Sequence, residues 1–64
     1  MTRERLSELE EIARGAANLS MEKAPRSRCE VFSTFAVFYF SGPTSSPGHL
    51  ATVSVDADGN ATVQ

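Results

Sequence analysis

The sequence predicts a small α+β fold: one N-terminal amphipathic helix packed on a three-stranded antiparallel sheet, in the order α-β-β-β. Two observations predict it. Near the N-terminus apolar residues recur at spacings of three and four, which indicates a helix with one buried stripe. After Pro25 they instead cluster or alternate between turn-forming segments, which indicates strands. The 64 residues leave room for one domain, so we expect residues 1–64 to form a single unit.

We expect the helix to run from residue 2 to about residue 23. Thr2 is a suitable N-cap, and Pro25 disfavours helical geometry in the residue before it. Gly15 lies on the solvent side of the helix, where neutral tolerance is the simplest interpretation. The apolar stripe consists of Leu6, Leu9, Ile12, Ala13, Ala16 and Leu19.

The second element is the most apolar part of the chain, a strand expected from about residue 29 to residue 41. Its centre, residues 31–40, holds all four phenylalanines and the only tyrosine. Because strand side chains alternate, an unbroken strand would be apolar on both faces. One face would carry Phe32, Ala36, Phe38 and Phe40, and the other Val31, Phe35, Val37 and Tyr39.

Two further strands follow, at residues 49–55 and 61–64. The segment 41–48 is rich in proline, glycine and serine, which is typical of a loop that can join antiparallel neighbours. Residues 49–55 alternate in polarity, with His49 on the same face as Val53 and Val55. The segment 56–60 contains Asp-Gly, the strongest turn signal in the chain.

Composition argues for a soluble protein of the cytoplasm. Cys29 is the only cysteine, so no disulfide can form within the chain, and a reducing compartment suits it. The charged N-terminus is unlike a signal peptide, and the ten-residue apolar run is far shorter than the roughly 20 residues of a membrane-spanning helix. A net charge of −2 gives no electrostatic reason to bind nucleic acid.

No motif predicts catalysis, a cofactor or a metal. Asp56, Asp58 and Asn60 resemble the opening of a calcium-binding loop, but Ala61 stands where that loop needs glycine. Cys29 could act with His49 as a nucleophile pair, yet nothing local supports this. If Cys29 is exposed, we expect Arg26 and Arg28 to lower the pKa of its thiol. We therefore expect a protein without enzymatic activity, without a cofactor and without a metal site.

An alternative function is binding of single-stranded nucleic acid. The basic segment Lys23–Arg28 could contact phosphates, while Phe32 or Tyr39 stacked on bases. Glu30 follows this segment directly, and the same aromatic residues are needed for a core. We therefore rank this alternative below protein binding.

The two apolar faces of the central strand carry the main functional prediction. A single helix covers only one of them, and an open apolar face on a small protein usually marks an interaction surface. We expect a second copy, giving a homodimer, or another protein to cover it. From size and charge, an accessory or inhibitor protein is one hypothesis, including phage-encoded inhibitors such as anti-CRISPR proteins. The sequence does not choose the outward face, so the predicted interaction residues are Phe35, Val37, Tyr39, Phe38 and Phe40.

Overall fold

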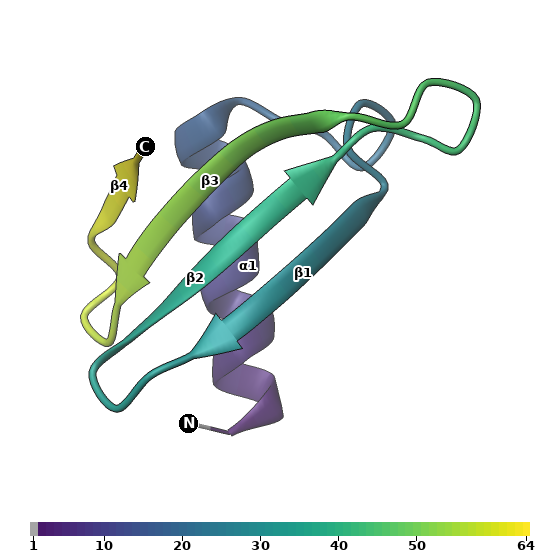
Figure 1. The fold of residues 1–64 in the computed structure, drawn as a ribbon. Coiled ribbons are helices and arrows are strands. Elements are labelled where there is room, and N and C mark those ends of the chain that lie inside the picture. The colour runs from purple at the N-terminus through teal and green to yellow at the C-terminus, as the bar shows by residue number, and fades with distance from the viewer. Residues whose placement is uncertain (1) are drawn as a thin grey trace.

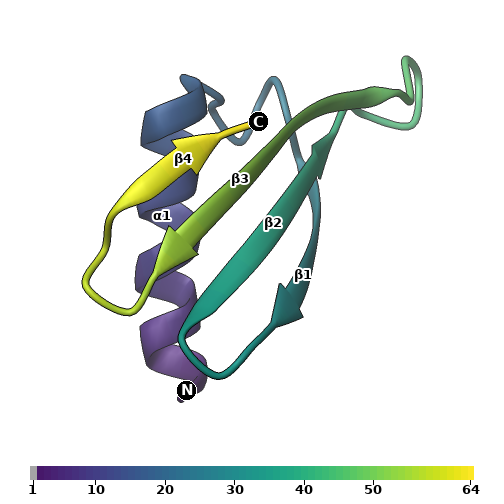
Figure 2. The same cartoon turned by 60° about the vertical axis from the view of Figure 1, so that its left-hand side comes forward.

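The computed structural model describes residues 2–64 and confirms the α+β class. One helix, α1, lies against one face of an antiparallel sheet whose strands follow one another in chain order (Figure 1). Figure 2 shows the same two layers turned by 60°, with β4 crossing in front of α1. The sheet has four strands, one more than the sequence predicted. The elements are α1 (Arg3–Ala17), β1 (Arg26–Val31), β2 (Phe35–Ser41), β3 (His49–Asp56) and β4 (Ala61–Val63).

Helix α1 begins as predicted but ends earlier. The hydroxyl of Thr2 accepts a hydrogen bond from the backbone N–H of Arg5, which makes Thr2 the N-cap. The predicted end near residue 23 is wrong, because Asn18 adopts a left-handed conformation and closes the helix. Its backbone N–H bonds back to the carbonyl oxygens of Arg14 and Gly15. Asparagine tolerates this conformation better than most residues, and it ends the helix well before Pro25, the residue on which the predicted boundary was based.

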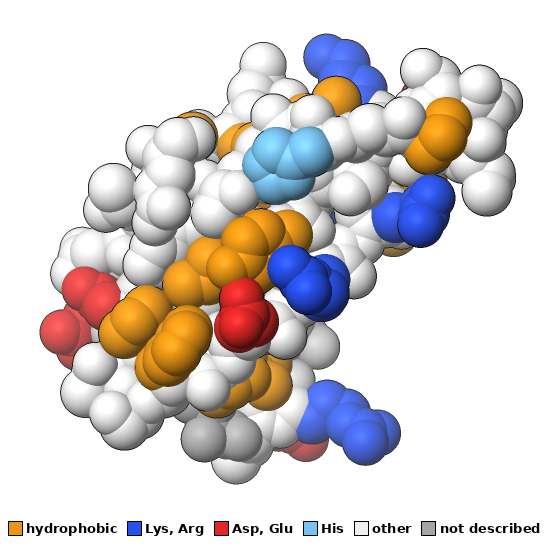
Figure 3. Space-filling view, viewed as in Figure 1, with side chains coloured by type: hydrophobic (Ala, Val, Ile, Leu, Met, Phe, Trp, Pro, Cys, Tyr) orange, Lys and Arg blue, Asp and Glu red, His pale blue; other side chains and the backbone are white. Residues whose placement is uncertain are grey.

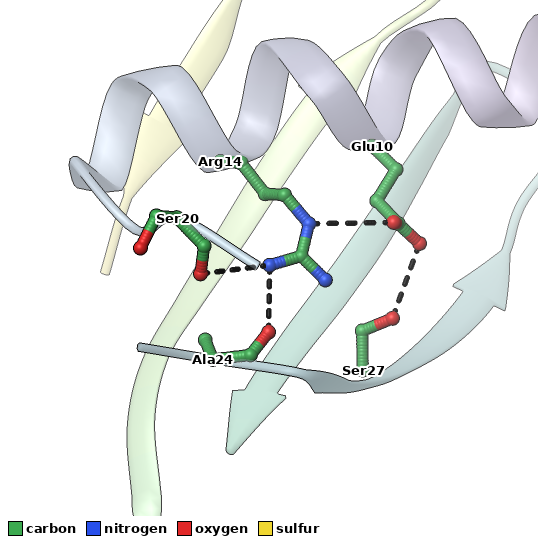
Figure 4. A network of polar contacts seen from close by, with 5 residues as sticks. All are labelled: Glu10, Arg14, Ser20, Ala24 and Ser27. Carbon is green, nitrogen blue, oxygen red and sulfur yellow. Dashed lines mark hydrogen bonds and ion pairs between the residues drawn. The ribbon is translucent and has the colours of Figure 1, made fainter. Parts of the chain in front are cut away.

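A polar network centred on Arg14 fixes the segment after the helix (Figure 4). The Arg14 guanidinium donates to the carbonyl oxygen of Ala24 at 2.7 Å and lies 4.9 Å from the centre of the Phe40 ring. It also reaches the carbonyl of Ser20 and pairs with the Glu10 carboxylate, which in turn accepts a hydrogen bond from Ser27 on β1. One arginine thus connects α1, the connecting segment and the core.

Replacement of Gly15 by alanine is expected to stabilise the fold. A Cβ built at this position meets nothing within 4 Å, and the backbone is helical. Alanine restricts the unfolded chain and favours helix, so we expect the free energy of unfolding to rise by about 0.5–1 kcal/mol. Urea denaturation followed by circular dichroism measures this change. An unchanged midpoint would contradict the expected gain, and a lowered midpoint would mean that glycine is needed at this position.

The predicted strand 29–41 is instead a hairpin. β1 and β2 pair antiparallel from Arg26 opposite Ser41 to Val31 opposite Ala36, and residues 32–34 form the turn. The backbone N–H of Phe32 donates to the carbonyl of Phe35 at 2.8 Å to close it. Ser33 and Thr34 are turn-compatible residues, and the high β-propensity of the phenylalanines around them hid the break.

The core lies between α1 and the inner face of β2 and β3. Phe38 and Phe40 are 1% and 0% exposed, and they pack against Leu9 and Ala13 of the helix and against Val53 and Val55 of β3. Helix α1 covers β2, β3 and β4 but makes no comparable contact with β1. The inner side of β1 is therefore left open, and all six of its residues are exposed.

The β2–β3 pairing contains an irregularity that changes the position of His49. Phe40 lies opposite Ala51, whereas Ser41 lies opposite His49, so Leu50 is an extra residue. A bulge of this kind reverses the alternation beyond it. His49 consequently lies with Ser41 on the outer side of the sheet, and the prediction that it shares a face with Val53 and Val55 is wrong. The turn at 56–60 is confirmed, with Gly59 at a φ of 90°.

No helix within residues 2–64 combines the length and apolar character needed to cross a lipid bilayer.

Candidate protein-interaction surface

The face of the sheet turned away from α1, here the outer face, is not covered by any element within residues 2–64 (Figures 1 and 2). Strand register assigns its residues, because directly opposite residues share a face. The outer face consists of Arg26, Arg28 and Glu30 of β1; Phe35, Val37, Tyr39 and Ser41 of β2; His49, Thr52, Ser54 and Asp56 of β3; and Thr62 of β4.

An apolar patch crosses the centre and one end of this face, and Figure 3 shows it as adjoining orange surfaces. We define the outer patch as Phe32, Phe35, Val37 and Tyr39. Phe32 is 45% exposed and its ring stacks on Phe35, with 4.6 Å between ring centres. Val37 is only 8% exposed. The most accessible apolar surface is therefore at the Phe32 and Phe35 end.

Long side chains of β1 partly cover Tyr39. The Arg28 guanidinium lies 4.6 Å from the centre of the Tyr39 ring, and the phenol O–H donates a hydrogen bond to the Glu30 carboxylate. This hydrogen bond raises the pKa of Tyr39, because it favours the neutral phenol. The side chains of Arg28 and Glu30 therefore provide part of the cover that we expected from a partner.

Charge on the outer face is divided along the strands. The cationic end of the face lies at the C-terminal end of β2 and carries Arg26, Arg28 and His49. Asp56 lies at the other end, beside Phe35. Glu30 lies on β1 between these ends. The phenylalanine end of the outer patch is thus flanked by carboxylates, and the tyrosine end by cations.

A hollow of about 610 Å³ adjoins the phenylalanine end. Phe35 forms an apolar wall, Ser54 and Thr62 contribute hydroxyls, and Asp56 and Asp58 contribute carboxylates. The turn between β3 and β4 closes one side. A second, smaller hollow of about 300 Å³ lies at the other end, lined by Arg26, Ser27, Arg28, Tyr39, Ser41 and His49.

The structure separates the five predicted interaction residues by face. Phe35, Val37 and Tyr39 lie on the outer face, while Phe38 and Phe40 form the centre of the core and are inaccessible in the folded protein. Two expectations about faces are wrong. Phe32 is separated from Phe38 and Phe40 by the turn and joins the outer patch, whereas Val31 lies opposite Ala36 on the inner side.

The basic segment Lys23–Arg28 is divided in the same way. Arg26 and Arg28 reach the outer face, but Lys23 lies in the turn before β1.

Cys29 and His49 are on opposite faces of the sheet. Cys29 lies opposite Phe38 and therefore faces inward, while the His49 ring lies in the smaller outer hollow, 3.0 Å from the Thr52 hydroxyl. Burial raises the pKa of the Cys29 thiol, and the carboxylates of Glu10 and Glu30 raise it further. The expectation that Arg26 and Arg28 would lower this pKa is wrong.

Asp56 has a structural role in the β3–β4 turn. Its carboxylate accepts hydrogen bonds from the backbone N–H groups of Asp58 and Asn60, both at 2.9 Å, and from the Asn60 side chain. The hydrogen bonds from Asn60 and then from Asp58 and Gly59 hold the pKa of Asp56 below its usual range. Among residues 2–64, no group of three or more metal-binding side chains is close enough to hold an ion.

The lowered pKa of Asp56 predicts a specific pH dependence. A carboxyl whose pKa is lower in the folded state stabilises that state above its ordinary pKa of about 3.9, and the contribution is lost as pH falls through the folded value. We expect Asp56→Asn to lower the thermal midpoint at pH 7, with the difference from wild type narrowing below pH of about 4. A constant difference across a pH series of melting curves would contradict this role.

Sequence reasoning missed several residues of this surface. The hollow beside Phe35 depends on Ser54, Asp56 and Thr62, which come from two strands joined by a turn. The alternation of residues 49–55 already placed Ser54 away from the core, so this signal was available. The position of Phe32 required recognition of the Ser33-Thr34 turn.

Comparison with known proteins gives no relative: no family model, curated protein or solved structure matches this chain.

Proposed function

We propose that this protein is a non-catalytic protein-interaction module that binds its partner through the outer face of the sheet. The observation that carries the proposal is the outer patch, which exposes Phe32 stacked on Phe35 beside a hollow and lies on a face without a covering element among residues 2–64. Interfaces of this kind have an aromatic centre and a polar rim.

The charges around the patch indicate the chemistry of the partner. Asp56 and Asp58 line the hollow next to Phe35, and neither has an ion-pair partner among residues 2–64. A segment that places an apolar side chain on Phe32 and Phe35 and a lysine or arginine in the hollow would satisfy both features. We therefore infer an apolar-basic segment of a partner protein as the ligand.

The wider biological role is part of the same proposal. A small, acidic interaction module of the cytoplasm would suit an accessory or inhibitor protein, including a phage-encoded inhibitor of the anti-CRISPR type. The lone Cys29 thiol is compatible with a reducing compartment.

Selection from a displayed random-peptide library tests the binding surface directly, because it does not require the natural partner. We expect wild-type protein to select peptides with apolar and basic residues in close succession. Phe35→Glu adds charge to the patch and should weaken binding of a selected peptide by on the order of 100-fold, as for the loss of an interface hot spot. The matched control is Met21→Glu, which changes an exposed apolar residue away from the sheet.

Comparison of the two variants shows whether the peptide binds at the outer patch. Circular dichroism first establishes that both remain folded. Binding that survives Phe35→Glu, or that Met21→Glu weakens equally, would place the surface elsewhere and overturn the proposal. Failure to select any peptide would have the same consequence.

One observation favours nucleic-acid binding as a second candidate. Arg26, Arg28 and His49 surround the smaller hollow next to the Tyr39 ring, a combination that could hold a phosphate and a base. Against it, Arg28 occupies the ring face and Glu30 lies beside it. Fluorescence anisotropy with a labelled single-stranded oligonucleotide at low salt decides the question. Salt-dependent binding that Arg26→Gln weakens would support this candidate, and absence of binding at low salt would remove it.

A further inference from the structure

The outer edge of β1 forms one side of the sheet and has no paired strand within residues 2–64. β1 is the first strand in the sheet order, and both ribbon views show it at the margin of the sheet (Figures 1 and 2). The other edge strand, β4, has only three residues, whereas β1 has six. A long edge strand is a template for pairing with another strand.

Strand geometry identifies the backbone groups that are free along this edge. In antiparallel pairs, residues alternate between those that exchange hydrogen bonds with the neighbour and those that do not. Phe32 donates to Phe35, so the even-numbered residues Arg28 and Glu30 bond to β2 in the same ladder. The backbone N–H and C=O groups of the alternate residues therefore point away from β2, toward the free edge of the sheet. These residues are Ser27, Cys29 and Val31.

Self-pairing of this edge has one favourable register. In this register two copies of β1 run antiparallel with Cys29 opposite Cys29 and Ser27 opposite Val31. The free backbone groups of each copy can then bond to those of the other. Arg28 then lies opposite Glu30 of the second copy, twice by symmetry, and opposite charges in this arrangement attract. A shift of two residues in one direction places Arg26 opposite Glu30 but brings Arg28 opposite Arg28 at the centre, and in the other direction it places Glu30 opposite Glu30. A shift of one residue breaks the match of free backbone groups.

We propose that this protein forms a two-fold symmetric dimer by antiparallel pairing of β1 with β1 of a second copy, centred on Cys29. Only the register centred on Cys29 pairs opposite charges without placing like charges opposite one another, and this match commits the edge to a second copy rather than to a foreign strand. The resulting sheet is continuous, with both outer faces on one side and both helices on the other.

The inner side of β1 suits this arrangement. Helix α1 reaches it only through Glu10, which accepts a hydrogen bond from Ser27, and Val31 is 49% exposed there although it lies opposite the buried Ala36. In the dimer, Val31 and Cys29 of one copy lie next to Ser27 and Cys29 of the other, between the two helices. The second copy thus covers apolar surface that the chain alone leaves open.

The dimer uses a different surface from the proposed peptide site. The proposed function concerns the outer face, and the dimer concerns the β1 edge, so each can fail without the other. Pairing at the edge keeps both outer faces open and on the same side, which gives a bivalent binding surface if the proposed function holds.

A charge-exchange experiment tests the dimer. Sedimentation velocity across a concentration series should show wild-type protein converting from monomer to dimer. Arg28→Glu and Glu30→Arg each place like charges opposite one another, so each alone should dimerise on the order of tenfold more weakly or worse. An equimolar mixture of the two variants restores both opposite-charge pairs. We therefore expect a heterodimer, identified by a mass tag on one variant.

Two more variants keep the outcome decisive. Cys29→Pro removes an N–H that points outward, a position where an edge strand tolerates proline, and should give a folded monomer that still binds a selected peptide. Phe35→Glu should lose the peptide and keep the dimer. A wild-type monomer at every concentration would overturn the proposal, as would a mixture that stays monomeric. A dimer that Phe35→Glu dissociates would assign self-association to the outer face and equally overturn it.

Discussion

Phe38→Ala is expected to remove most of the stability of the protein at room temperature. Phe38 is 1% exposed and packs in the core cluster with Leu9, Phe40 and Val53. Truncation of a buried phenylalanine removes its transfer free energy and leaves a cavity, a loss of about 3–5 kcal/mol. A domain of this size has a total stability near the lower end of about 5–15 kcal/mol.

Chemical denaturation of wild type and variant measures this loss, and Phe32→Ala is the matched control. Phe32 is also an aromatic residue of the β1–β2 hairpin, but it is exposed and its ring stacks on Phe35. We expect its truncation to cost less than about 1 kcal/mol, as for an exposed residue with one aromatic neighbour. Similar losses for both variants would contradict the assignment of Phe38 to the core and Phe32 to the surface.

Arg14→Ala is expected to be the most destabilising change at a charged position. The Arg14 side chain is only 11% exposed, and it joins the Ala24 carbonyl, the Glu10 carboxylate and the Phe40 ring. Its removal leaves the Ala24 carbonyl without this donor and uncovers the Phe40 ring. We expect a loss of about 2–4 kcal/mol, from lost charge-assisted hydrogen bonds and lost packing together.

Two further variants separate these contributions. Arg14→Met keeps most of the apolar stem over Phe40 but removes the donors, so it should recover part of the stability lost in Arg14→Ala. Lys23→Ala removes an exposed cation in the same connecting segment and should change stability by less than about 0.5 kcal/mol. Equal midpoints for Arg14→Ala and Lys23→Ala in urea denaturation would show that the network in Figure 4 contributes nothing to stability.

The parts of the fold that could be predicted from sequence are those with local signals. Thr2 was identified as the N-cap, and Asp-Gly identified the last turn. The end of the helix was missed because it depends on the left-handed backbone of Asn18, which competes with a continued helical pattern through Leu19. The break in the aromatic strand was missed because Ser33 and Thr34 are weak turn formers next to strong strand formers.

The candidate surface was predictable only in part, for a geometric reason. Alternation correctly grouped Phe35, Val37 and Tyr39, but it could not state which group faces the helix. That choice follows from packing: Ala36, Phe38 and Phe40 present the surface that Leu9 and Ala13 can fill. The free edge of β1 depends on the four-stranded order, and the sequence pattern gave no separate first strand.

The outer face leaves less apolar surface exposed than the sequence indicated. Two of the apolar residues predicted to need a partner, Val37 and Tyr39, are partly covered by neighbours within the sheet. Arg28 and Glu30 provide this cover at Tyr39, and the same two residues define the register of the proposed dimer. The surface left for a partner is concentrated on Phe32, Phe35 and the adjoining hollow.

Mapping of backbone amide chemical shifts during titration with a selected apolar-basic peptide tests the central claim most directly. The claim is that the outer face at its phenylalanine end binds the partner. We predict that the largest shifts occur at Phe32, Phe35, Ser54 and Thr62, with little change along the exposed side of α1. Largest shifts on α1, or on the inner side of β1 near Cys29, would contradict the claim.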